Sequence, residues 1–176
     1  PFRIASWGAG AFVVLTLIAM FIYPGGTISD TTTKGYRFFE NFFSDLGYLT
    51  AHNGAANPIA SKLFLVALSL AGLSLLLFFV AFRQFFLSSR NLKILSGLGT
   101  AIGGLSGLCF IGIAFNPADV RMGAHIFFVL WAFRLFPVLR HFMQQRSLCT
   151  LHILGFTAGS WSDLWFFWWG TFCYWS

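Results

Sequence analysis

Three residues in two short segments have side chains that could share one chemical task. Asp45 lies in "NFFSDLGYLTAHNGAANP" (41–58), whereas Asp119 and His125 lie in "NPADVRMGAH" (116–125). Two carboxylates beside a histidine favour the imidazolium, so such a group can hold a proton, or a cation when the ring is neutral. We therefore predict that these residues form one hydrogen-bonded cluster, with Arg121 as the counter-charge.

Two interpretations of these residues stay open. In the first, the cluster with His52 as a further ligand is a metal site for hydrolysis. In the second, Asp119 only caps a helix, while Asp45 and His52 are solvated. The sequence has no GxSxG, HExxH or Walker motif, and its three cysteines are too far apart for a zinc knuckle. Motifs alone therefore assign no catalytic residue, metal or cofactor.

The composition is that of an integral membrane protein, and it limits which elements can position these residues. Of the 176 residues, 57% are apolar and 9% are charged, and the mean hydropathy is +0.76. Each membrane span takes about 20 residues, so we predict one transmembrane domain over residues 1–176. The net charge of +6 comes from Lys and Arg scattered at the ends of apolar runs. This pattern is typical of contact with lipid and excludes a nucleic-acid partner.

Apolar runs predict an all-α, polytopic bundle of about five transmembrane helices. Long continuous runs exclude a β-barrel, whose strands alternate over about 10 residues. Pro24-Gly25-Gly26 ends the first helix, and Asn57-Pro58 begins the second with an N-cap and a proline at the first helical position. The predicted helices cover about 4–23, 59–86, 92–115, 122–142 and 149–172.

The first loop is predicted to contain a short helix lying in the membrane interface. "YRFFENFFSDLG" (36–47) places aromatic residues at helical spacing on one face and leaves Arg37, Asn41 and Ser44 for water, with Gly47 as the C-cap. Basic residues near the helix ends place the N-terminus and the 82–93 linker in the cytoplasm and the 25–58 loop outside. The basic residues that set this orientation are Arg3, Arg83, Arg90, Lys93, Arg140 and Arg146.

Glycines in the third predicted helix indicate close helix packing. Gly99, Gly103 and Gly107 are spaced by four residues in "GLGTAIGGLSGLCFIG". Small residues at this interval let two helix backbones approach within a membrane. We expect these three glycines to form a main contact of the bundle.

The ordered motifs of residues 40–145 resemble the bacterial membrane-protein family called domain of unknown function 998. The resemblance implies a helix bundle in a bacterial inner membrane and supplies no reaction. The residues that match the pattern in order are Ser44, Asp45, Leu46, Gly47, Asn57, Pro117, Asp119 and His125.

Three classes of function are compatible with these features. The preferred class is a non-catalytic accessory or structural subunit that packs against other membrane protein subunits, with a respiratory or photosynthetic complex as the possible assembly. The second is the metal-dependent membrane hydrolase with the Asp/His site at the outer face. The third and weakest is a small transporter, because the spans carry few polar residues and no visible repeat.

Overall fold

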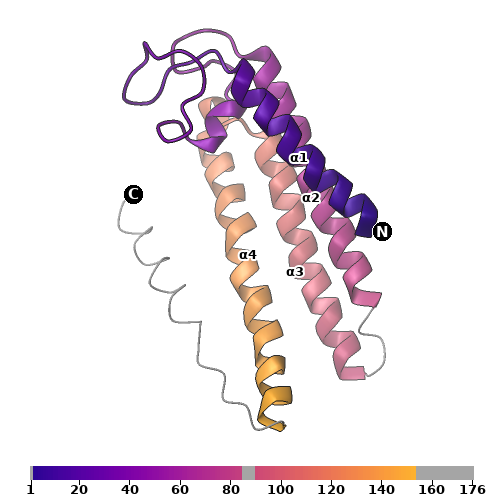
Figure 1. The fold of residues 1–176 in the computed structure, drawn as a ribbon. Helices are drawn as coiled ribbons and strands as arrows, with labels where there is room; N and C mark the ends of the chain where they lie inside the picture. Colours follow the sequence, from indigo (N-terminus) through magenta and orange to yellow (C-terminus); the bar gives the residue numbers. More distant parts are fainter. Residues whose placement is uncertain (1, 85–89, 154–176) are drawn as a thin grey trace. The chain divides into compact units, whose positions relative to one another are not determined.

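The computed structural model describes residues 2–84 and 90–153, and side chains in most of that part. The chain consists of two compact units, residues 1–139 and residues 140–176. Within the described residues every regular element is a helix and none is a strand, which confirms the predicted all-α class. The elements are α1 (Phe2–Ile22), the 3-10 helix η1 (Phe43–Gly47), α2 (Pro58–Arg83), α3 (Arg90–Phe115) and α4 (Ala118–Ile153) (Figure 1).

Three helices in the described part are long and apolar enough to cross a membrane. They are Phe2–Ile22, Pro58–Arg83 and Ser96–Phe115, with 21, 26 and 20 residues. A helix satisfies all its backbone hydrogen bonds internally, which hydrocarbon requires. The chain is therefore an integral membrane protein by the length and composition of these helices, whereas the count of five spans stays a prediction.

The last described helix differs from the predicted boundaries. α4 runs from Ala118 to Ile153 without a break through the predicted linker at 143–148, and its backbone kinks at Arg121 (φ −135°, ψ 54°). Residues 138–153 contain no glycine or proline, and the Leu, Arg, Met and Gln among them favour helix, so nothing local ends it. The first residues of the predicted fifth helix, 149–153, belong to α4, and residues 154–172 lie outside the described part of the chain.

The helices pack in chain order, with α2 against both α1 and α3. Gly72 of α2 and Gly107 of α3 bring the two backbones together, because a Cβ on Gly107 would lie 2.7 Å from the carbonyl oxygen of Gly72. Gly103 faces the ring of Phe79, which leaves no room for a side chain. Gly103 and Gly107 therefore lie close to α2, and a main contact of the bundle through Gly99, Gly103 and Gly107 stays a prediction.

The first half of α4 packs on the other side of α3. The Ser106 hydroxyl donates a hydrogen bond of 2.9 Å to the carbonyl oxygen of Ala132. Gly112 lies against the ring of Phe128, and Ala132 belongs to the same buried cluster as Cys109. These contacts bring Asp119 and His125 to the end of the bundle where α3 ends.

Candidate functional site

Residues 23–57, called the cap below, cover the end of the bundle where α1 ends and α2 begins (Figure 1). The chain turns at Gly25 and Gly26, whose φ angles are +128° and +83°. A side chain at Gly26 would also collide with His52, since its Cβ would lie 2.6 Å from the His52 carbonyl carbon. Glycine at this position therefore lets two distant parts of the cap touch.

Leu46 anchors the cap between α1 and α2. It is fully buried in a cluster with Ala19 and Tyr23, at the end of α1, and with Phe64 and Leu68 of α2. Next to it, Gly47 lies flat on the Phe64 ring, because a Cβ would come within 2.7 Å of Cδ1. Gly47 is thus a packing residue and the last residue of η1, and its prediction as the C-cap is wrong, because Tyr48 occupies that position.

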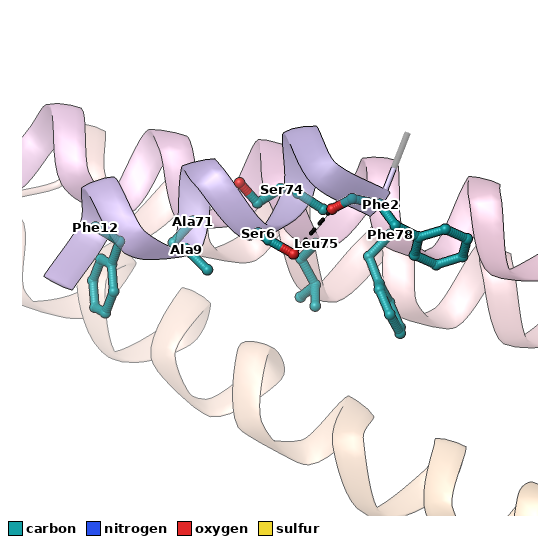
Figure 2. Close-up of a pocket in the computed structure, with 9 residues that line it drawn as sticks. Phe2, Ser6, Ala9, Phe12, Ala71, Ser74, Leu75 and Phe78 are labelled. Atoms are coloured by element: carbon teal, nitrogen blue, oxygen red, sulfur yellow. Dashed lines mark hydrogen bonds between the residues drawn. The ribbon is translucent and has the colours of Figure 1, made fainter.

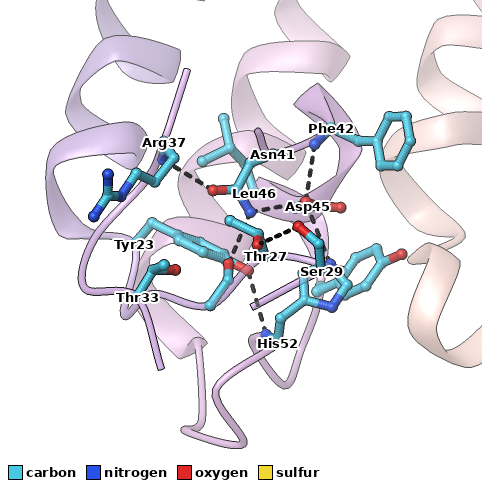
Figure 3. A network of polar contacts seen from close by, with 12 residues as sticks. Tyr23, Thr27, Ser29, Thr33, Arg37, Asn41, Phe42, Asp45, Leu46 and His52 are labelled. Atoms are coloured by element: carbon cyan, nitrogen blue, oxygen red, sulfur yellow. Dashed lines mark hydrogen bonds and ion pairs between the residues drawn. The ribbon is translucent and has the colours of Figure 1, made fainter. Parts of the chain in front are cut away.

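Asp45 carries the buried charge of the cap. Its Oδ2 atom accepts hydrogen bonds from the Phe42 amide (2.9 Å) and the Asn41 side-chain amide (3.0 Å), and lies 3.3 Å from Nε2 of His52 (Figure 3). Its Oδ1 atom is buried without a hydrogen-bond partner. A buried carboxylate needs partners of this kind because hydrocarbon and protein interior do not solvate charge. The interpretation of Asp45 as a solvated residue is therefore wrong.

His52 is also largely buried, with 17% of its side chain exposed. Its backbone amide donates to the Tyr23 hydroxyl (3.4 Å), and its ring lies against the Tyr48 ring with centroids 5.1 Å apart. The 3.3 Å approach to Asp45 is an ion-pair distance for a protonated ring, but the geometry at Nε2 does not make a hydrogen bond. The expectation that His52 is solvated is wrong, since the loop folds its ring over Asp45.

Two asparagine side chains hold the backbone of the cap. Asn41 accepts from the Arg37 amide (2.9 Å) and donates to the Gly26 carbonyl (2.8 Å). Asn57 is buried and donates to the carbonyl oxygens of Leu46 (3.2 Å) and Tyr48 (2.9 Å). Asn57 occupies the predicted N-cap position before Pro58, but its side chain bonds the cap and makes no capping bond to α2.

These bonds explain why the predicted interfacial helix at 36–47 does not form as expected. Only Phe43–Gly47 is helical, as a five-residue 3-10 helix, and turns precede it. Asn and Asp side chains that bind nearby backbone groups compete with the helical ladder. Asn41 was predicted to face water, yet it is buried beside Asp45. Asn41 and Asp45 lie four residues apart, so a turn of the chain brings the two side chains together.

Burial and the charge of Asp45 raise the pKa of each tyrosine in the cap. Burial, followed by the charge of Asp45 and the neighbouring Tyr23, raises the pKa of Tyr36 to about 12. Burial also raises the pKa of Tyr23 and of Tyr48, and Asp45 and Asp119 add to both shifts. All three phenols therefore keep their protons at neutral pH and can donate as well as accept hydrogen bonds.

Asp119 and His125 bind backbone groups of different segments. Oδ2 of Asp119 accepts from the amides of Leu49 (2.8 Å) and Thr50 (3.1 Å), so the start of α4 holds the cap. His125 is buried, and its Nδ1 lies 2.9 Å from the carbonyl oxygen of Asn116. Because a carbonyl oxygen only accepts, Nδ1 carries the proton.

The predicted single cluster of Asp45, Asp119 and His125 is thus divided into three separate contacts. Across residues 2–84 and 90–153 no hydrogen bond or ion pair joins any two of them, and Arg121 forms no ion pair with either carboxylate. No group of three His, Cys, Asp or Glu side chains within the same residues is close enough to hold a metal ion. The reason is that each side chain satisfies a different piece of irregular backbone, which the sequence pattern does not reveal.

A second feature outside the cap is an apolar groove along α1 and α2 (Figure 2). Its volume is about 340 Å³. Small residues lie in its middle, with phenylalanine rings to either side (Figure 2). Ser6 donates a hydrogen bond to the Phe2 carbonyl of its own helix (3.1 Å). The lining residues are Phe2, Ala5, Ser6, Ala9, Phe12, Ala71, Ser74, Leu75 and Phe78.

Comparison of the chain with family models, curated proteins and solved structures finds no match.

Proposed function

We propose that the protein is a non-catalytic polytopic membrane protein that serves as an accessory or structural subunit of a larger membrane assembly. The observation that carries this proposal is the use of the polar side chains. Asp119 and Asn57 bind main-chain groups of the cap, and His125 binds a main-chain carbonyl at the end of α3. A general acid or base must reach a substrate atom with a free proton or lone pair. Side chains committed to the backbone support a structural role.

The groove between α1 and α2 supports the subunit part of the proposal. Helices associate in lipid mainly through close van der Waals packing, which small residues permit. Ala5, Ala9 and Ala71 make the groove shallow-walled and apolar, so a side chain from the helix of another subunit can enter it. A respiratory or photosynthetic complex is the class of assembly in which we expect such a subunit.

The test is purification from native membranes in mild detergent. We expect stoichiometric recovery with a larger assembly, and recovery as a species of one chain's size would contradict the proposal. Ala9→Leu fills the groove and should lower the recovery of partners. Gly10→Leu is the matched control on the same helix, because a side chain at Gly10 meets open space.

The alternative function is the metal-dependent hydrolase, and one observation favours it. Oδ1 of Asp45 and Nε2 of His52 are both buried without a hydrogen-bond partner, so two potential ligands are available next to each other. A catalytic zinc site uses three protein ligands. Elemental analysis of the purified protein and of Asp45→Asn tests this alternative: stoichiometric zinc that is lost in the variant would reverse the order of the two proposals.

A further inference from the structure

The segment at residues 38–43 has its polarity reversed relative to a surface in water. Phe38, Phe39 and Phe42 are 67%, 97% and 61% exposed, whereas Asn41 and Asp45 are buried. The ring of Phe42 points away from the polar network that its own amide joins (Figure 3). Burying one such ring stabilises a protein by about 1.5–3 kcal/mol. Three exposed rings therefore indicate that the surroundings of this segment are apolar.

Ring contacts locate this segment below the end of the bundle. Phe43 packs edge-on against Phe12, with centroids 6.1 Å apart, and against Phe64, with centroids 5.1 Å apart. Phe12 lies in the middle of α1, about 15 Å before its end at 1.5 Å per residue. Phe64 lies about 9 Å inside α2 by the same rise. η1 therefore lies alongside the spans, and the cap reaches down the side of the bundle.

Irregular backbone at membrane depth occurs only where its polar groups are bound by protein. Three side chains bind backbone groups in and beside the segment in this way. Asp45 binds the Phe42 amide, Asn41 binds the Arg37 amide and the Gly26 carbonyl, and Asn57 binds the carbonyls of Leu46 and Tyr48. The inward polar groups and the outward rings thus have one common physical cause.

We propose that residues 38–43 lie in the membrane interface, with the rings of Phe38, Phe39 and Phe42 inserted among lipid acyl chains and the backbone at the level of the headgroups. The occupant of this surface is lipid because the surface continues the apolar faces of α1 and α2, which are themselves long enough to cross the membrane. Arg37 and Glu40, which pair at 3.8 Å with about half of each side chain exposed, mark the level of the headgroups. The cap therefore anchors the protein at one face of the bilayer.

The experiment is spin-label accessibility in proteoliposomes. Single cysteines replace Phe42 and Phe39 in a background without Cys109, Cys149 and Cys173, and each carries a nitroxide. Oxygen dissolves in the bilayer, whereas a water-soluble nickel chelate does not. We expect both labels to collide with oxygen several-fold more than with the chelate.

Two positions in the same background calibrate the measurement. Val14→Cys, exposed near the middle of α1, represents a lipid-facing site, and Thr32→Cys, exposed in the cap, represents water. Labels at 42 and 39 that match Val14 support the proposal, and labels that match Thr32 overturn it. Low collision with both reagents also overturns it, because it means that protein covers the rings. Phe39→Cys provides the reading by itself where Phe42→Cys does not fold.

Discussion

Asn57 should contribute strongly to the free energy of unfolding, and Asn57→Ala tests this. The substitution removes the donor of two hydrogen bonds, at 3.2 and 2.9 Å, and leaves the Leu46 and Tyr48 carbonyls without it. A buried acceptor without a partner costs about 1–3 kcal/mol, so loss of both bonds should destabilise the protein by about 2–6 kcal/mol. Because these bonds hold η1 against the bundle, the cap should detach first.

Asn53→Ala is the matched control, with the same change in the same loop. Asn53 is exposed and makes a local bond of 3.0 Å to the Ala55 amide, so its loss should cost no more than about 0.5 kcal/mol. The assay is reversible unfolding in mixed detergent micelles, with protease cleavage of the cap as a second probe. Equal destabilisation by the two variants would refute the reasoning that the Asn57 side chain holds the cap.

The remaining predictions concern packing, ionisation and orientation. Gly107→Leu should lower the thermal stability far more than Ala101→Leu, because a side chain at 107 meets a backbone oxygen of α2 while Ala101 is exposed. Equal melting temperatures of the two variants would show that Gly107 makes no close contact with α2. Tyr36 should ionise near pH 12, so its contribution to the free energy of unfolding should be complete below pH 10 and lost as the pH rises from 10 to 12. Ultraviolet titration of the protein and of Tyr36→Phe measures this ionisation, and identical titration curves for the two proteins would contradict the prediction. Cysteines at Thr32 and Ser89 should label from opposite sides of intact cells, and labelling from one side would refute the predicted orientation.

The helices of the described bundle are readable from the sequence because a membrane leaves the chain few choices. Backbone groups in hydrocarbon must be satisfied within a helix, so long apolar runs predict α1, α2 and α3 with errors of only a few residues at their ends. The glycine spacing likewise predicts that Gly107 approaches another helix, since only a residue without a side chain allows this distance. The partner glycine, Gly72, carries no comparable signal in α2.

The cap could not be predicted in the same way. A helical pattern of phenylalanines at 36–47 predicts an amphipathic helix on the assumption that the polar face meets water. In the folded protein Asn41 reaches a carbonyl 15 residues away, and Asp119 reaches amides 69 and 70 residues away. These partners are set by how α1, α2 and α4 converge at one end of the bundle.

Composition and apolar periodicity therefore decide that this chain is a helical membrane protein, because the cost of unsatisfied backbone in lipid is local to each span. Packing decides instead which groups lie beside the four polar side chains of this region and so which contacts they make. These residues are Asp45, His52, Asp119 and His125. Tertiary structure separates the residues that the sequence pattern grouped, since Asp45, Asp119 and His125 each bind the backbone groups that packing brings beside them.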